Sequence, residues 1–525
     1  MDCRRGRGGH RLHALDWDAV STASLSPLIL TLVTFAPLAG ALLLSFMPRR
    51  DREIRWFALL VSVTAFLLSL HLPAAFASST PGFQFELDRQ WITAPNIHYH
   101  LGVDGISMWL VLLTTFLVPL CVLISWRSVH ERVKEFFILL LVLETGLIGV
   151  FVSLDLFLFY FFWEASLIPM ALLIGMYGHE RRVYAAVKFF LFSMIASVFM
   201  LAAIIWLYAN TGSFDFVTIR AAIREGHIAG FGPASFWLFL GFFVAFAVKV
   251  PLFPLHTWLP DAHVEAPTAG SVLLAGVLLK MGTYGLLRFN AGLFPREAQR
   301  QAPWIISLAI IGIIYGALVA MVQPNLKKLV AYSSISHLGF VVLGIFSFSQ
   351  AGTDGAVYQM LNHGISTGAL FMLVGMLYER RHTFEIRDFG GLATPMPVYA
   401  TFFLFITLSS IGLPLLNGFV GEFLILSGAF SAKALYGTLA ATGVIWSAAY
   451  MLWTYQRVFF GAIRHDKNRA LPDLDARERL ALWPAALLAL VMGVAPVLWL
   501  RDIDPAVKTN SAPIERPVVV PVVGR

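Results

Sequence analysis

The sequence predicts an all-α protein that crosses a membrane about fourteen times. Its mean hydropathy is +0.74, and only 13% of its 525 residues are charged, whereas a soluble protein has roughly a quarter. Alternation typical of the strands of an outer-membrane barrel does not dominate anywhere in the chain. Apolar segments of about 20 residues, each long enough to span a bilayer, lie near 25–47, 56–77, 104–126, 136–153, 156–177, 186–208, 235–256, 267–288, 304–323, 329–347, 357–378, 396–426, 437–460 and 480–500.

The basic residues of the loops predict how the chain is oriented. Loops that follow odd-numbered spans hold about twice as many Lys and Arg as the other loops together with the C-terminal tail, and positive charge favours the cytoplasmic side. We therefore expect both termini outside the cytoplasm. The N-terminal tail, with four arginines in "MDCRRGRGGHRLHALD", disagrees with this orientation and stays unassigned.

Two of the predicted spans contain helix breaks. The run "GFFVAFAVKVPLFPLHTWLP" in span 7 has Pro251 and Pro254, and "SSIGLPLLNGFVGE" in span 12 has Pro414 between glycines. Broken helices at comparable positions are typical of inverted repeats in transporters, and a separation of five spans inverts the second unit. We thus expect a tail (1–24), spans 1–3 (25–135), a first repeat of spans 4–8 (136–290), a second repeat of spans 9–13 (304–462), and a final part (463–525) with a cytoplasmic loop, span 14 and a tail.

Four ionisable residues lie near the middle of apolar spans, where such groups are rare and are functional-site candidates by default. Glu164 and Lys249 have opposite charges, and pairing is the cheapest way to hold either in low dielectric, so they are expected to form an ion pair. Lys280 has no acid near it in sequence, and its burial disfavours the charged form, as a proton relay requires. Glu422 completes a set of two acids and two bases.

Three further residues extend this set. Glu144 is another acid in an apolar span, and His337 and His363 can carry a proton at physiological pH. A structural interpretation stays open for each residue, because long side chains snorkel and buried polar groups can tie helices together. The set as a whole predicts a proton or ion pathway.

The chain resembles the antiporter-like subunits of proton-pumping NADH:quinone oxidoreductase, respiratory complex I, over about residues 100 to 460. The resemblance is carried by the strings "GVDGISMWLVLLTTFLVPL", "LDLFLFYFFWEASLIPM", "VKVPLFPLHTWLPDAHVEAPTAGSVLLAGVLLKMGTYGLLR" and "LKKLVAYSSISHLGFV". Glu422 stands where the chain L and chain N types carry a lysine, and a long lateral helix at the C-terminus is missing. Both features favour the chain M type, the counterpart of mitochondrial subunit 4.

The resemblance implies a role in proton translocation coupled to quinone reduction elsewhere in the complex. Asn325 stands where relatives commonly show an aspartate, so no proton role is expected there. The implied relay consists of the charge pair Glu164 and Lys249, the central Lys280, the linking His337 and His363, the terminal Glu422 and a further carboxylate, Glu144.

The resemblance also sets expectations for cofactors, partners and location. The complex as a whole uses NADH, FMN, iron–sulfur clusters and quinone, but this chain has two cysteines and lacks GxGxxG after a strand, so it is expected to hold no cofactor or metal. Its expected partners are chain L and chain N type membrane subunits and lipids, with no nucleic acid. The expected location is the bacterial inner membrane, with periplasmic termini.

Several alternatives remain at this stage. A multisubunit cation/proton antiporter shares the lysines but typically has lysine in span 12, and a membrane-bound hydrogenase subunit is related. A haem cytochrome is disfavoured because paired histidines at regular spacing on two helices are missing. A purely structural membrane scaffold would leave the set of four buried charges unexplained. The sequence also leaves open sodium as the transported ion in place of protons.

Overall fold

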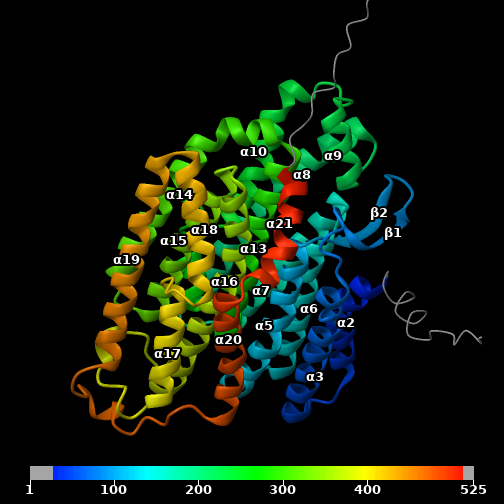
Figure 1. Ribbon diagram of the computed structural model, residues 1–525. Coiled ribbons are helices and arrows are strands. Elements are labelled where there is room, and N and C mark those ends of the chain that lie inside the picture. Colours follow the sequence, from blue (N-terminus) through cyan, green and yellow to red (C-terminus); the bar gives the residue numbers. More distant parts are fainter. Residues whose placement is uncertain (1–27, 512–525) are drawn as a thin grey trace, which may run out of the picture.

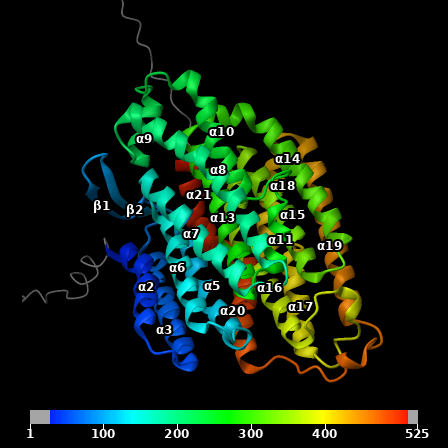
Figure 2. The same ribbon diagram turned by 180° about the vertical axis from the view of Figure 1, so that it is seen from behind.

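The computed structural model describes residues 28–511, which form one bundle of helices with a two-stranded β-hairpin at one end (Figure 1; Figure 2). The predictions for the N-terminal tail lie outside the described residues. The elements in chain order are α2 (Ile29–Phe46), α3 (Asp51–Ser69), α4 (His71–Ala75), β1 (Gln84–Ile92), β2 (Ile97–Val103), α5 (Ser107–Ser128), α6 (Val133–Val152), α7 (Leu156–Tyr177), α8 (Arg182–Thr211), α9 (Phe216–Glu225), α10 (Phe231–Lys249), α11 (Trp258–Glu265), α12 (Thr268–Leu273), η2 (Leu274–Leu278), α13 (Leu279–Gly285), η3 (Leu286–Ala291), α14 (Pro295–Met321), α15 (Leu326–Phe346), α16 (Gln350–Arg381), η4 (Ile386–Asp388), α17 (Pro397–Ser410), α18 (Asn417–Ala432), α19 (Ala434–Phe459), η5 (Asp466–Asn468), α20 (Ala476–Val494) and α21 (Val497–Ser511).

The predicted apolar segments all fall on helices, and the polytopic helical fold is confirmed. Among the described residues, 12 helices are long and apolar enough to cross a membrane, or 13 if α20 and α21, bent by 70°, count as one span. The difference from fourteen arises in the segment 396–426, which forms the two shorter helices α17 and α18.

The break in span 7 lies directly after Lys249, where α10 ends and the chain runs irregularly to Trp258, the first residue of α11. The carbonyl of Ala247 accepts a hydrogen bond from the amide of Leu252 at 2.8 Å, and the carbonyl of Val248 accepts one from the indole of Trp258 at 2.8 Å. Protein groups thus satisfy the carbonyl that Pro251 frees and a second one at the end of α10, as backbone inside a membrane requires.

The second break separates α17 from α18, as predicted for span 12. Gly412 in this break has φ +75°, a backbone conformation that glycine adopts without steric cost. Both predicted breaks are therefore present. The inverted relation between spans 4–8 and 9–13 stays a prediction.

Two features of the fold were not predicted. The antiparallel hairpin β1–β2 stands between the second and third spans, with residues 93–96 as its turn. Span 8 contains two π-helical stretches, η2 and η3, on either side of α13. Such widened turns occur frequently at functional sites.

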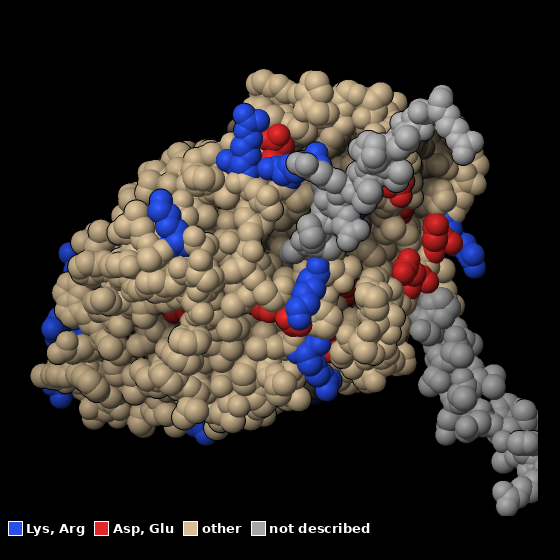
Figure 3. Space-filling view, turned by 45° about the horizontal axis from the view of Figure 1, so that its top comes forward, with Lys and Arg blue, Asp and Glu red and all other residues tan. Residues whose placement is uncertain are grey.

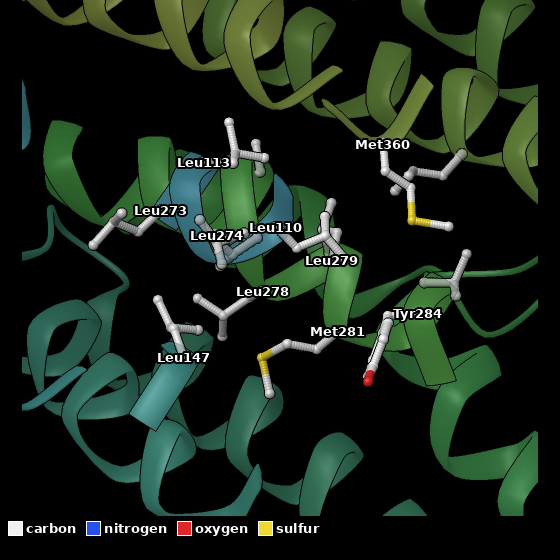
Figure 4. Packing of buried hydrophobic residues seen from close by; sticks show 14 of the residues in the cluster. Leu110, Leu113, Leu147, Leu273, Leu274, Leu278, Leu279, Met281, Tyr284 and Met360 are labelled. Carbon is white, nitrogen blue, oxygen red and sulfur yellow. The ribbon is translucent and has the colours of Figure 1, made fainter. Parts of the chain in front are cut away.

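The middle of the bundle is formed by span 8 and by α16, whose apolar windows are completely buried. Leucines from α5 and α6 and a methionine from α16 enclose span 8 (Figure 4). Outer helices such as α3 and α8 instead expose large apolar side chains, as expected of surfaces that face lipid. Any polar group in the middle of this bundle is therefore far from bulk water.

Candidate functional site

Lys280 lies on α13, in the middle of the buried span 8. Its side chain is fully buried, and Nζ lies 2.6 Å from Nδ1 of His363 on α16. Nζ also donates a hydrogen bond to the carbonyl of Ala275, a residue of the π-helical stretch η2. The widened turn thus provides a main-chain acceptor for the lysine, and the fold brings two predicted site residues together across 83 positions of sequence.

His363 faces a second buried imidazole, that of His337 on α15. The ring centroids lie 5.9 Å apart at an interplanar angle of 59°, and Nε2 of each ring has no hydrogen-bond partner among the described residues. A cavity of about 10 Å³ touches both rings together with Asn362 and Ser366. This volume approaches the space that one water molecule needs, and its walls are polar.

Glu422 on α18 lies against the other side of His337. Its Oε1 is 3.0 Å from Nδ1 of His337 and accepts a hydrogen bond of 3.2 Å from the amide of Gln359. A Cβ atom on Gly412 would stand 2.9 Å from Oε2, so the glycine in the second break makes room for the carboxylate. Four predicted residues therefore form a buried row of Lys280, His363, His337 and Glu422.

Polar side chains also gather at the second break. The hydroxyl of Ser409 lies 2.5 Å from Oδ1 of Asn417 and 2.7 Å from the hydroxyl of Ser366, and Asn362 donates to the carbonyl of Asn417 at 2.7 Å. Sequence reasoning missed these residues. The serines and the asparagine beside Pro414 in "SSIGLPLLNG" were the signal for them.

Lys249 does not form the ion pair with Glu164 that the sequence predicts. Its Nζ lies 5.3 Å from the ring centroids of Trp163 and Phe189, and neither Nζ nor Oε1 of Glu164 has a hydrogen-bond partner among residues 28–511. The reason is local: Trp163 precedes Glu164 on α7, so the two side chains project in directions about 100° apart. The ring of Trp163 faces Lys249, and aromatic faces attract ammonium groups.

Glu144 stands apart from this row. It is fully buried in α6, and neither of its carboxyl oxygens hydrogen-bonds to a described residue. Asn325, for which no proton role was expected, is the N-cap of α15, and its Oδ1 accepts from the amide of Lys328 at 3.0 Å.

Two further buried bases were missed in the sequence. His263 on α11 is fully buried and stacks on Phe371 with centroids 4.4 Å apart, and both its ring nitrogens lack a described hydrogen-bond partner. Lys327, which the sequence placed in a loop, is buried at the start of α15 and donates to the carbonyl of Ala266 at 2.6 Å. His263 lies in "HVEAP" and Lys327 in "LKK". Both stretches lie between the predicted apolar spans, so neither residue stands out as a charge in the middle of a span.

A cavity of about 850 Å³ opens at the end of the bundle opposite the hairpin. It is lined by loop residues and by the C-terminal end of α16, including His179 and Glu379. Burial, with a smaller contribution from the positive charge of Lys327, lowers the pKa of His179 to about 4, so this imidazole is neutral at neutral pH. Within the described part of the chain, no group of three or more His, Cys, Asp or Glu is placed to hold a metal ion.

Comparison with known proteins shows the family of the chain. A family model described as NADH:quinone oxidoreductase/Mrp antiporter matches residues 153–447, and one described as NADH-ubiquinone oxidoreductase chain 4, amino terminus, matches residues 32–150. NADH-quinone oxidoreductase subunit M of Rhodobacter capsulatus is 48% identical over 491 residues, which cover 91% of this chain and 95% of that protein. The chain belongs to the subunit M family of NADH-quinone oxidoreductase.

Solved structures support the same assignment. A chain of respiratory complex I from Thermus thermophilus, solved with bound NADH, superposes with a TM-score of 0.83 at 34% identity and covers 92% of this chain and 100% of that chain. A chain of the Mrp complex from Dietzia sp. DQ12-45-1b superposes with a TM-score of 0.80 at 19% identity, covering 93% and 98%, which shows a shared fold. Subunit M is thus a multi-pass membrane component of an enzyme complex, and its partners are other membrane subunits.

Proposed function

We propose that this chain carries protons through the buried row of Lys280, His363, His337 and Glu422, driven by quinone reduction elsewhere in the complex. The observation that carries this proposal is the succession of short contacts: 2.6 Å from Lys280 to His363 and 3.0 Å from His337 to Glu422. The small cavity that His337 and His363 both line could hold one water molecule, and such a water would complete the connection. Every member of the row can bind and release a proton.

The energy scale is consistent with this role. Moving one charge against the membrane potential costs about 2.3 kcal/mol per 100 mV. Two charges about 4 Å apart interact by about 4 kcal/mol at an effective dielectric constant of 20. Making and breaking one buried contact between charges can therefore offset the transfer of one proton.

Glu164 and Lys249 supply the switch in this proposal. The structure holds Lys249 over two aromatic rings, without Glu164 as a partner. The proposed cycle alternates between this unpaired arrangement and one in which the two charges meet. Pairing stabilises the ammonium form of Lys249, and separation releases its proton toward Lys280.

The orientation and the assembly belong to the same proposal. The distribution of basic loop residues supports an orientation with the large cavity at the cytoplasmic face and the hairpin at the periplasmic face of a bacterial inner membrane. Both termini then lie outside. Chain L and chain N type subunits are the expected neighbours. The NADH, FMN, iron–sulfur and quinone sites then lie in other subunits of the complex.

The proposal is tested by Lys280→Met in the whole complex, with inverted membrane vesicles that oxidise NADH. We expect proton uptake per NADH to fall while electron transfer from NADH to an artificial acceptor that bypasses quinone continues. Lys467→Met is the matched control, because Lys467 is exposed in the short helix η5, outside the long apolar helices. If assembled Lys280→Met complex takes up as many protons per NADH as the control, the row does not carry protons.

A further inference from the structure

Arg288 occupies the outer end of span 8, two helical turns beyond Lys280. Its side chain is only 3% exposed, and it forms a 2.6 Å ion pair with Asp104, which precedes α5. It also donates to Oδ1 of Asn510 on α21 at 3.2 Å and to the hydroxyl of Tyr284 at 3.4 Å. The guanidinium carbon lies 5.2 Å from the ring centroid of Phe83. Four parts of the chain thus enclose one cation.

Water can reach this cation from outside. A cavity of about 300 Å³ on the hairpin side is lined by Arg288, Asp104, Asn510, Glu86 and Arg220. Viewed with this end forward, the surface has few charged side chains, and the acidic ones gather on the right, the side of the hairpin (Figure 3). Charged and polar walls keep such a cavity hydrated.

The helix connects this cavity to the proposed relay by a short route. Lys280, Tyr284 and Arg288 follow one another at intervals of four residues, so they share one face of the helix. Eight residues of helix correspond to about 12 Å. Tyr284, labelled in Figure 4, lies between the two cations on this face, and its hydroxyl lies 3.4 Å from Nε of Arg288.

Without a barrier, a proton on Lys280 would have this direct way out, and the histidines and Glu422 would be bypassed. Lys280 turns away from it, because Nζ bonds back to Ala275 and across to His363. The stretch between Lys280 and the outer cavity ends at Arg288, whose guanidinium cannot relay a proton. A guanidinium has five N–H donors and no acceptor, and it stays protonated at any physiological pH. A fixed positive charge also repels an approaching hydronium, as in water channels that exclude protons.

Asp104 does not provide a way around the arginine. Its Oδ2 accepts from Arg288, and its Oδ1 accepts from the amides of Ile106 and Ser107 at 3.1 and 3.0 Å. The amide of Asn510 is engaged on both sides as well, since its Nδ2 donates to the carbonyl of Leu287. The two side chains that hold the guanidinium, Asp104 and Asn510, are thus both engaged in further hydrogen bonds.

We propose that Arg288, held by Asp104 and Asn510, is a proton barrier that closes the outer end of span 8 and prevents protons on Lys280 from leaking to the outside. This rests on the proposed proton-carrying role of Lys280. In this proposal the ion pair of Arg288 and Asp104 takes no part in proton transfer itself. It prevents loss of the protons that the relay moves.

The test measures passive proton permeability of proteoliposomes that contain the whole complex, without NADH, under an imposed potassium diffusion potential. Arg288→Gln should raise proton entry about tenfold, equivalent to about 1.4 kcal/mol on the barrier. Arg288→Lys keeps the charge and should stay tight. Arg220→Gln is the matched control, because Arg220 lines the same cavity and donates to the carbonyls of Thr509 and Asn510.

The double variant Lys280→Met with Arg288→Gln separates a leak through the relay from general damage. We expect it to restore wild-type tightness. Assembly is checked by native electrophoresis, and Asp104→Asn with Arg288→Gln, which leaves a neutral polar pair, replaces the single variant if that one does not assemble.

Two results would overturn the barrier. One is wild-type permeability in the assembled variants that lack the charge at position 288. The other is a proton leak that persists in the double variant Lys280→Met with Arg288→Gln. Such a leak would not pass through Lys280, and it would not count against the proposed relay. A failure of the relay itself shows separately, as unchanged proton uptake per NADH in Lys280→Met.

Discussion

Glu422 is the residue at which the outward end of the row meets a helix break. Its carboxylate receives hydrogen bonds from His337 and Gln359 and lies against Gly412. The break lets an acid lie at this depth in the bundle, because irregular backbone inside a membrane is tolerated only where protein or a water-filled cavity surrounds it.

Glu422→Gln keeps the size of the side chain but cannot bind a proton. We expect quinone-linked NADH oxidation to fall by roughly 10²-fold, the lower end of the range for loss of a proton-transfer group, while electron transfer to an artificial acceptor is unchanged. Measuring both rates in the same membranes checks this. Equal quinone-linked rates in variant and wild type would remove Glu422 from the row.

At the scale of residues, the sequence predicted identities better than contacts. Lys280, His363, His337 and Glu422 stood out because ionisable groups are rare in apolar segments. Their partners could not be derived, since a contact such as that between Lys280 and His363 depends on how distant helices pack. The predicted contact between Glu164 and Lys249 is not formed in this structure, because charge alone does not fix side-chain direction.

Among the elements, the break between α17 and α18 depends on one glycine. Gly412→Ala would place a methyl group 2.9 Å from Glu422 in a left-handed backbone conformation, which costs about 1–2 kcal/mol for a residue with a side chain. We expect less assembled complex and a lower proton yield per NADH.

Gly232→Ala is the control for this variant, because a Cβ there meets no atom within 4 Å and its φ is not positive. Native electrophoresis and proton uptake in vesicles report the two effects. Identical behaviour of the two alanine variants would mean that the break tolerates a side chain and does not position Glu422.

The hairpin is attached to the bundle through a titratable histidine, His100. His100 on β2 lies 2.7 Å from Asp215, the N-cap of α9, and 3.3 Å from Glu86 on β1. Partial burial lowers the pKa of His100, but the hydrogen bond and negative charge of Asp215, with further contributions from Glu86 and Asp88, outweigh it, so the pKa is raised above its ordinary value of 6.5.

The sign of this shift sets a pH dependence. The stabilisation is fully present below the unfolded pKa of about 6.5 and is lost as pH rises through the raised, folded pKa. Hydrogen exchange of the amides of β2, corrected for intrinsic rates, should therefore accelerate across that window. His100→Gln should abolish the dependence, and an unchanged profile in this variant would show that His100 is not the titrating group.

Two kinds of element were not predicted, for different reasons. The hairpin lies between the apolar helices α4 and α5, and its stretch "IHYHLGV" is too short to stand out beside apolar spans. The π-helical turns around Lys280 leave no compositional trace, because they depend on packing between span 8 and its neighbours. Prolines, in contrast, act locally, and both predicted breaks were found.

For the whole molecule, composition and span length were enough to predict a polytopic helical protein, because the bilayer constrains backbone so strongly. They were not enough to predict which helices lie at the centre. The buried positions of span 8 and α16 follow from the complete bundle, and these two helices hold Lys280 and His363. We infer that a proton crosses the middle of the bundle between these two residues and Glu422.

Proton uptake per NADH by inverted vesicles of the His363→Gln complex tests that claim most directly. This variant interrupts the row in its middle and leaves Lys280, His337 and Glu422 in place. We expect His363→Gln to lower the number of protons taken up per NADH as much as Lys280→Met does, with electron transfer to an artificial acceptor preserved. An unchanged ratio in assembled complex would contradict it, because protons would then cross without the imidazole that joins the two halves of the row.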